Sequence, residues 1–327
     1  MANSCSFTAG IKMKNFSLII LIFLHTLAFA QRFGSNSYFR TIDYFDKEDS
    51  SKNFAIVYRP NEPANSLLVL LPDFGESPQM AEIETDIPKV AVLQGILTVI
   101  LSNNEGNLSF QIDQNAQNYL DTIISILLLK YQIPNDKYYL GGFSLGGAAV
   151  VKYVQHCNVF DVIPKPKAVF AIDPPLDFYR LYNVYDRWLS DTSSFFNNKK
   201  MYITMLEKMR TYFRGDLSNA YENYLKLSPY SYEDKNKVGV RLFDDTPITV
   251  FCEPDFDWAM NEKQWSAYDL NVIDNVSFIN ELKKRGHKQA QIKLTKDKGF
   301  RKILKFKHPH SWSIANPNET VKWLLRY

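Results

Sequence analysis

The chain has 327 residues, of which 46% are hydrophobic and 14% aromatic, so it can bury a large core. Its 38 lysines and arginines nearly balance its 35 aspartates and glutamates and form no basic block, which argues against nucleic-acid binding and polybasic membrane attachment. Three cysteines, with no CxxC or Cys/His pattern, exclude a disulfide-rich scaffold and suggest no metal site, and we expect no cofactor.

Residues 1–30 have the pattern of a secretory signal peptide. Lys12 and Lys14 precede an apolar run, and Ala28-Phe29-Ala30 forms an A-x-A cleavage site. The apolar run is about 15 residues long, shorter than the roughly 20 that span a bilayer. We therefore expect cleavage after Ala30, a secreted or periplasmic protein, and no stable membrane insertion once the signal is removed.

From about residue 53 onward, short apolar runs alternate with helical patterns. This alternation is typical of a mainly parallel sheet covered by helices on both faces. The predicted strands are 53–58, 66–72, 95–101, 137–142, 167–173, 247–253 and 290–295. Helices are predicted over 117–133, 275–286 and 316–325. We expect one α/β domain over 31–327, in which the two remaining cysteines, Cys157 and Cys252, are buried free thiols.

Residues 174–245 interrupt the alternation. They separate two strands by about 70 residues, whereas one crossover helix needs only 10 to 15. Helical patterns over 198–213 and 219–227 predict a helical insertion. Its aromatic side chains are candidates to enclose a substrate, but their helical spacing favours packing within the insertion itself. They are Tyr179, Tyr182, Tyr185, Trp188, Phe195, Phe196, Tyr202, Tyr212, Phe213, Tyr221, Tyr224, Tyr230 and Tyr232.

The stretch "YLGGFSLGGAAVV" (139–151) joins a predicted strand to a predicted helix. Within it, Gly142 and Gly146 flank Ser144 as G-x-S-x-G. A serine lifted out of a strand end by a sharp turn tolerates only small residues two positions away on either side. The helix that follows points free N–H groups and its positive dipole end at the serine. The context therefore predicts a nucleophile at Ser144, with Gly141 and Gly147 left to packing.

With this motif in place, residues 53–327 outside the insertion resemble the α/β-hydrolase family of esterases, lipases and serine peptidases. The family commonly places a lid over the serine at this point of the chain, so the resemblance implies that the insertion 174–245 acts as a lid. That family carries a serine, an acid and a histidine in this order along the chain. The resemblance implies that the acid follows a late strand, and we expect Asp255, with Asp257 and Glu253 as alternatives. Asp173 follows the preceding strand, a position that some members use, but we interpret it as a cap of its own loop.

The resemblance places the catalytic histidine after the last strand. His310 is followed by Ser311 and Trp312, a small residue and an aromatic residue as in relatives, and is the histidine we expect. His308 is its competitor, two residues away.

The resemblance also implies two backbone donors for an oxyanion. These are the N–H groups of Leu145, directly after the nucleophile, and of Phe74, in the loop after the strand 66–72. That loop reads "PDFGES" where many relatives have His-Gly-x-Gly, so Pro72 and Asp73 depart from the family pattern.

The function expected from these residues is a secreted serine hydrolase that cleaves a carboxylic ester through Ser144, His310 and Asp255 by an acyl-enzyme intermediate. The substrate would be a small-molecule or saccharide-linked ester. Two alternatives stay open: a serine peptidase with the same residues, and a binding protein that has kept the fold and lost turnover.

Overall fold

The computed structural model describes residues 37–45, 52–102, 108–162, 164–190 and 199–327. The predicted signal peptide lies outside these ranges, as do Phe195 and Phe196 of the insertion. Among the described residues, no helix is both long enough and apolar enough to cross a membrane.

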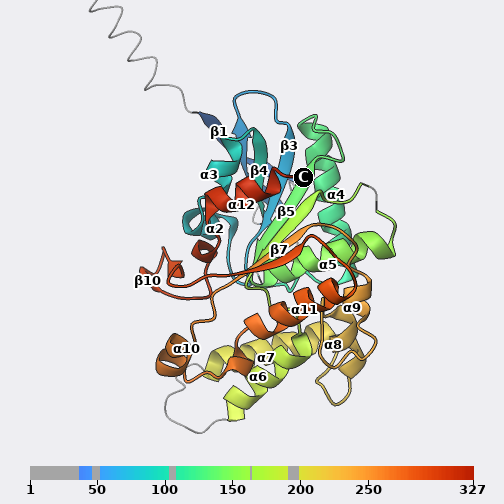
Figure 1. Ribbon diagram of the computed structural model, residues 1–327, viewed down its shortest axis with the longest axis vertical. Coiled ribbons are helices and arrows are strands. Elements are labelled where there is room, and N and C mark those ends of the chain that lie inside the picture. The colour runs from blue at the N-terminus through green and yellow to red at the C-terminus, as the bar shows by residue number, and fades with distance from the viewer. Residues whose placement is uncertain (1–36, 46–51, 103–107, 163, 191–198) are drawn as a thin grey trace, which may run out of the picture. The chain divides into compact units, whose positions relative to one another are not determined.

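Eight strands of the described ranges form one sheet in the order β1-β2-β4-β3-β5-β6-β7-β8 (Figure 1). The sheet is parallel from β4 to β8, and β2 runs antiparallel to both of its neighbours. The strands are β1 (Tyr38–Tyr44), β2 (Phe54–Pro60), β3 (Ser66–Leu71), β4 (Ile96–Leu101), β5 (Tyr138–Phe143), β6 (Ala168–Ile172), β7 (Ile248–Cys252) and β8 (Ala290–Leu294). A separate hairpin contains β9 (Phe300–Arg301) and β10 (Phe306–Lys307).

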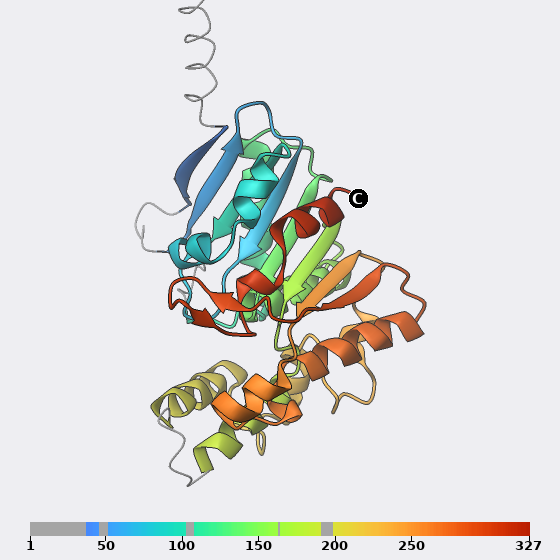
Figure 2. The same cartoon turned by 60° about the vertical axis from the view of Figure 1, so that its left-hand side comes forward.

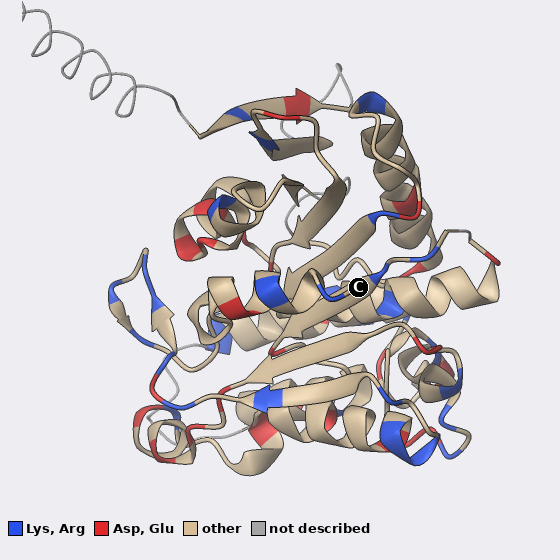
Figure 3. Ribbon diagram, turned by 45° about the horizontal axis from the view of Figure 1, so that its top comes forward, with Lys and Arg blue, Asp and Glu red and all other residues tan. Residues whose placement is uncertain are grey.

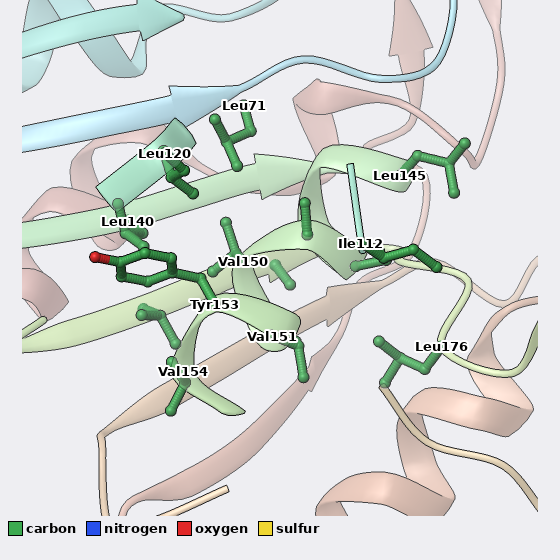
Figure 4. Packing of buried hydrophobic residues seen from close by; sticks show 14 of the residues in the cluster. Leu71, Ile112, Leu120, Leu140, Leu145, Val150, Val151, Tyr153, Val154 and Leu176 are labelled. Atoms are coloured by element: carbon green, nitrogen blue, oxygen red, sulfur yellow. The ribbon is translucent and has the colours of Figure 1, made fainter. Parts of the chain in front are cut away.

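Helices cover both faces of the sheet, because successive side chains of a strand point to opposite faces. In β3, Leu67 and Val69 pack in one buried cluster with α4 (Gln114–Lys130) and α5 (Leu145–Val159). Figure 4 shows α5 side chains such as Val150 beside Leu140 of β5. Leu68 and Leu70 pack in a second cluster with α3 (Ile87–Val92) and α12 (Pro317–Leu324). The predicted mainly parallel, doubly covered sheet is confirmed.

The charge distribution agrees with this burial. The strands β3 to β7 contain no charged residue, and Figure 3 shows lysines, arginines, aspartates and glutamates interspersed over helices and loops instead. Strands buried on both faces have no solvated side on which a charge could lie. Cys157 and Cys252 are both buried and free, as expected.

In the described part of the segment between β6 and β7 lie four helices: α6 (Phe178–Ser190), α7 (Lys199–Phe213), α8 (Tyr221–Leu227) and α9 (Val238–Arg241). Figure 2 shows most of this helical layer beyond the carboxyl ends of the parallel strands, together with α10 (Phe256–Lys263). Several of its aromatic rings pack on one another: Phe213 stacks on Tyr224 with ring centroids 4.2 Å apart, and both are fully buried. Much of the aromatic content of the insertion therefore forms its own core.

A buried ion pair attaches this layer to the main domain. Arg180 of α6 is 2% exposed, and its guanidinium holds both carboxylate oxygens of Asp274, which is fully buried, at 2.6 and 2.7 Å. Asp274 belongs to α11 (Val272–Lys284), which packs beside β8. The same guanidinium also donates to the carbonyl oxygen of Tyr268 and to Asn271 Oδ1. The guanidinium of Arg180 therefore ties α6 to α11 and to the residues just before α11.

Candidate active site

Ser144 lies on the sharp turn between β5 and α5. Its backbone has φ 53° and ψ −119°, a conformation that residues with a Cβ adopt only under strain. A Cβ on Gly146 would lie 2.1 Å from the carbonyl oxygen of Leu71, and one on Gly142 would lie 2.3 Å from that of Gly146. The steric requirement expected at both glycines is therefore present, and the turn holds Ser144 at the carboxyl edge of the sheet.

His310 connects Ser144 to an acid. Ser144 Oγ lies 3.0 Å from His310 Nε2, and Asp173 Oδ2 lies 2.6 Å from His310 Nδ1. A carboxylate only accepts hydrogen bonds, so Nδ1 carries the proton and Nε2 is free to accept from the serine hydroxyl. The ring also lies against Phe143, with centroids 4.7 Å apart, which limits its rotation. This is the arrangement of a nucleophile, a general base and an orienting acid.

Asp255 does not contact His310, so the prediction that it is the acid beside this histidine was wrong. Its Oδ1 accepts from the backbone N–H of Trp258 at 2.9 Å and so caps α10, and its Oδ2 lies 2.7 Å from Lys307 Nζ. This ion pair and the cap hold the pKa of Asp255 below its usual range.

The two alternative acids do not contact the histidine either. Asp257 is exposed on the first turn of α10. Glu253 accepts from the backbone N–H groups of Lys298 and Gly299 and from the hydroxyl of Thr295, so it fixes the chain that leads to the β9–β10 hairpin.

Strand order explains why Asp173 is the partner. It follows the last residue of β6, the strand directly beside β5, and Phe143 of β5 pairs with Ile172 of β6. The N–H of Ser144 donates to the carbonyl of Ile172 at 2.8 Å, and Ile172 is the residue directly before Asp173. Asp255 follows β7, one strand further away. In the sequence, Asp173 stands at the end of the predicted strand 167–173, a position that some members of the family it resembles use, but it was interpreted as a cap of its own loop.

His308 lies near His310 but has another environment. Its ring packs on Trp258, with centroids 4.7 Å apart. Burial, with the neighbouring His310 and nearby cations, lowers the pKa of His308 to about 3, so this ring is neutral at ordinary pH. His310, not His308, is therefore the histidine in contact with the serine.

The N–H groups of Leu145 and Phe74 converge on one point, as the sequence led us to expect. That point is occupied by Asp73: its Oδ1 accepts from Phe74 N at 2.6 Å and from Leu145 N at 3.3 Å. Sequence reasoning had located the two donors but had not assigned the Asp73 side chain to them.

A tight turn fixes the loop that carries Asp73. The N–H of Glu76 donates to the carbonyl of Asp73, and Gly75 has φ 78°, as the third residue of a type II turn requires. The carboxyl group of Glu76 accepts from Asp73 N and from the indole N–H of Trp312. Burial, reinforced by the charge of Asp73, raises the pKa of Glu76 to about 7. The loop that departs from the family pattern is thus anchored by a buried acid.

A cavity of about 650 Å³ opens over Ser144 and His310. Its walls are mostly apolar and come from α6, α7, α10 and the segment before α11. The apolar side chains among them, with the first residue of α11, are Leu181, Val184, Tyr185, Trp188, Met201, Tyr202, Met205, Trp258, Trp265, Leu270 and Val272. Side chains of the insertion therefore form part of the cavity walls. Trp258 and Trp265, which lie after β7, were not anticipated.

No group of three or more His, Cys, Asp or Glu side chains among the described residues could hold a metal ion. The residues around Ser144 are suited to proton transfer and to stabilising negative charge, which are chemical tasks that side chains and backbone N–H groups perform directly.

Neither a protein-family model nor a curated protein matches this sequence. Among solved structures, esterase B from Lactobacillus rhamnosis matches with a TM-score of 0.55 and 12% identity over 95% of this chain and 94% of its own. An S-formylglutathione hydrolase from Agrobacterium tumefaciens matches with a TM-score of 0.54 and 11% identity over 89% of this chain and 96% of its own.

Acylaminoacyl peptidase from Pyrococcus horikoshii also matches, with a TM-score of 0.54 and 14% identity over 92% of this chain. This chain spans only 41% of the length of that peptidase. At identities this low, the likenesses show a shared fold and leave the activity to be argued from the site.

Proposed function

The chain has the α/β-hydrolase fold, and from this premise we propose that it is a secreted serine hydrolase that cleaves carboxylic esters. One observation carries the proposal: His310 is hydrogen-bonded on one nitrogen to Asp173 and on the other to Ser144, at 2.6 and 3.0 Å. Three chemically matched groups in one chain of contacts are the arrangement that activates a serine hydroxyl.

In the first half of the reaction, Ser144 Oγ attacks the carbonyl carbon of the ester while its proton passes to His310 Nε2. Asp173 balances the positive charge that forms on the imidazole. When the tetrahedral intermediate collapses, the bond to the leaving oxygen breaks, and His310 returns the proton to that oxygen so that an alcohol departs. The acyl group remains on Ser144.

In the second half, water replaces the alcohol. His310 takes a proton from the water as it attacks the acyl carbon, and it then returns that proton to Ser144 Oγ as the carboxylic acid leaves. The N–H groups of Phe74 and Leu145 face the position of the oxyanion in both halves, once Asp73 has vacated it.

The cavity walls support an apolar acyl group. Aromatic and aliphatic side chains predominate around the serine, and 650 Å³ is within the range of small-molecule sites. Export is supported by residues 1–30, whose lysines, apolar run and A-x-A site have the pattern of a signal peptide.

A fluorophosphonate probe tests this function on the full chain. We expect the wild type to be labelled, Ser144→Ala to lose labelling, and His310→Gln to be labelled far more slowly. Ser218→Ala is the matched control, because Ser218 is exposed on the loop before α8, outside the cavity. Absence of labelling in the wild type, or labelling that survives in Ser144→Ala, would contradict the proposal.

A further inference from the structure

The Asp73 carboxylate occupies the position where a reaction intermediate would carry its negative charge. Both backbone donors that face this position, Phe74 N and Leu145 N, donate to Asp73 Oδ1. An ester carbonyl can use these donors only after the carboxylate has moved away. Asp73 is therefore in direct competition with the substrate for the same two hydrogen bonds.

The displaced carboxylate stays near the site, because the turn at Gly75 and the hydrogen bond from Asp73 N to Glu76 hold its backbone. When the Asp73 side chain changes to another χ1 rotamer, its carboxylate moves by only a few ångströms, on the order of its own length. It would then face the developing oxyanion at short range, and like charges repel strongly in a cavity with apolar walls. An uncharged ester gives Asp73 nothing to offset this repulsion.

The other acids of the cavity already have strong partners. Asp173 lies against His310, Glu253 binds backbone N–H groups of residues 298 and 299, and Asp269 pairs with Arg187 and Ser266. Among the described residues, no lysine or arginine forms an ion pair with Asp73. Lys200, the one lysine or arginine that lines the cavity in the described part of the chain, is exposed at the start of α7.

We propose that Asp73 selects substrates that carry a cationic group beside the scissile carbonyl, and that the class is esters or amides with a free α-ammonium group. This inference rests on the proposed serine hydrolase function. An α-ammonium nitrogen is two bonds from the carbonyl carbon, so it lies a few ångströms from the carbonyl oxygen that replaces Asp73 Oδ1. The displaced carboxylate can then pair with the ammonium group instead of facing the oxyanion alone.

Pairing between Asp73 and a substrate ammonium group also explains why the chain carries an aspartate in this loop, where its carboxylate occupies both oxyanion donors. Losing one oxyanion donor typically costs about 100- to 1,000-fold in rate, and here both donors begin engaged with Asp73. A substrate cation that draws Asp73 away releases both donors in one step. Asp73 therefore acts as a specificity-determining residue, and uncharged esters react slowly with the wild type.

The test compares two aryl esters in two proteins. One is the ester of leucine with a free α-ammonium group, and the other is the ester of 4-methylpentanoic acid, which lacks only that group. We measure kcat/KM for both with the wild type and with Asp73→Asn, which keeps the shape and removes the charge. The preference of each protein is its kcat/KM for the leucine ester divided by its kcat/KM for the uncharged ester. The intrinsic reactivities of the two esters cancel when the preference of the wild type is divided by that of Asp73→Asn.

We expect the preference for the leucine ester to fall by about 10- to 100-fold in Asp73→Asn, because a partly exposed charge pair is lost. We also expect Asp73→Ser, which vacates the position, to hydrolyse the uncharged ester faster than the wild type. Asp257→Asn is the control for general charge effects, since Asp257 is exposed on α10 and lines no part of this cavity. Its preference should equal that of the wild type.

Labelling of Ser144 by fluorophosphonate separates the possible failures. If both proteins are labelled and hydrolyse esters with the same preference, the selective role of Asp73 is wrong and the hydrolase function stands. If Asp257→Asn changes the preference as much as Asp73→Asn does, the effect is general charge and the inference is also wrong. If the wild type and Asp73→Asn both remain unlabelled and both fail to hydrolyse either ester, the inference and the proposed function fail together.

Discussion

The substitution Asp173→Asn tests the role of Asp173 as the acid that orients His310. The sequence predicted Asp255 as the partner of His310, whereas the structure places Asp173 there. At the 2.6 Å separation from His310, two unit charges in an effective dielectric of about 20 interact by about 6 kcal/mol. The side chains of His310 and Asp173 are 26% and 15% exposed, so water weakens this attraction. The amide also donates where the carboxylate accepts, which favours the wrong tautomer of the ring. We expect kcat to fall by about 1,000- to 10,000-fold.

The assay is hydrolysis of an aryl ester at neutral pH, with the rate of fluorophosphonate labelling as a second measurement. Asp255→Asn is the matched control, because asparagine caps a helix as well as aspartate does and the lost pair with Lys307 is partly exposed. Its rate should stay within about twofold of the wild type. An Asp173→Asn enzyme with more than about a tenth of wild-type activity, or an Asp255→Asn enzyme as impaired as expected for Asp173→Asn, would refute the assignment.

Three further predictions follow from contacts around the site. Gly146→Ala places a Cβ 2.1 Å from the Leu71 carbonyl oxygen, so the turn that holds Ser144 must shift. We expect Ser144 to lose labelling and the protein to be destabilised by about 1 to 3 kcal/mol, which a lower melting temperature would show. Glu76 keeps its proton to about pH 7 in the folded state but only to about 4.5 when unfolded, so the stability it contributes is full below about pH 4.5 and declines as the pH rises to about 7. Glu76→Gln should therefore gain stability relative to the wild type between pH 5 and pH 8, by up to about 3 kcal/mol, in urea unfolding; a constant difference would contradict the raised pKa. Arg180→Met leaves Asp274 charged and buried and should destabilise by about 3 to 5 kcal/mol, while Arg180→Met with Asp274→Leu should recover much of the loss in thermal unfolding.

The sequence located the parts of the site that depend on neighbours along the chain. The sharp turn at Ser144 needs only a strand before it, small flanking residues and a helix after it, and all of these are local sequence patterns. His310 was recognisable from the residues after it and its place behind the last strand. The acid was not, because the choice between Asp173 and Asp255 depends on which strand lies beside β5 and on where α10 begins. The neighbour of β5 and the first residue of α10 are both set by the folded structure and have no local sequence pattern.

Other misses have the same physical origin. Residues 38–44, which form β1 at the sheet edge, are mostly exposed and show neither an apolar run nor a regular alternation, so they were not predicted as a strand. The two-residue strands β9 and β10 are too short for any periodicity to show. The position of Phe74 N was predictable from the strand before it, whereas the rotamer that brings Asp73 onto that N–H depends on the opposing turn at Leu145.

The backbone of Ser144 carries a consequence for how this sequence can change over time. A left-handed φ with ψ −119° costs a residue with a Cβ about 1 to 3 kcal/mol, a cost that glycine would not incur. A change from serine to glycine would relieve this strain. The proposed use of the Ser144 hydroxyl as a nucleophile is what would oppose such a change.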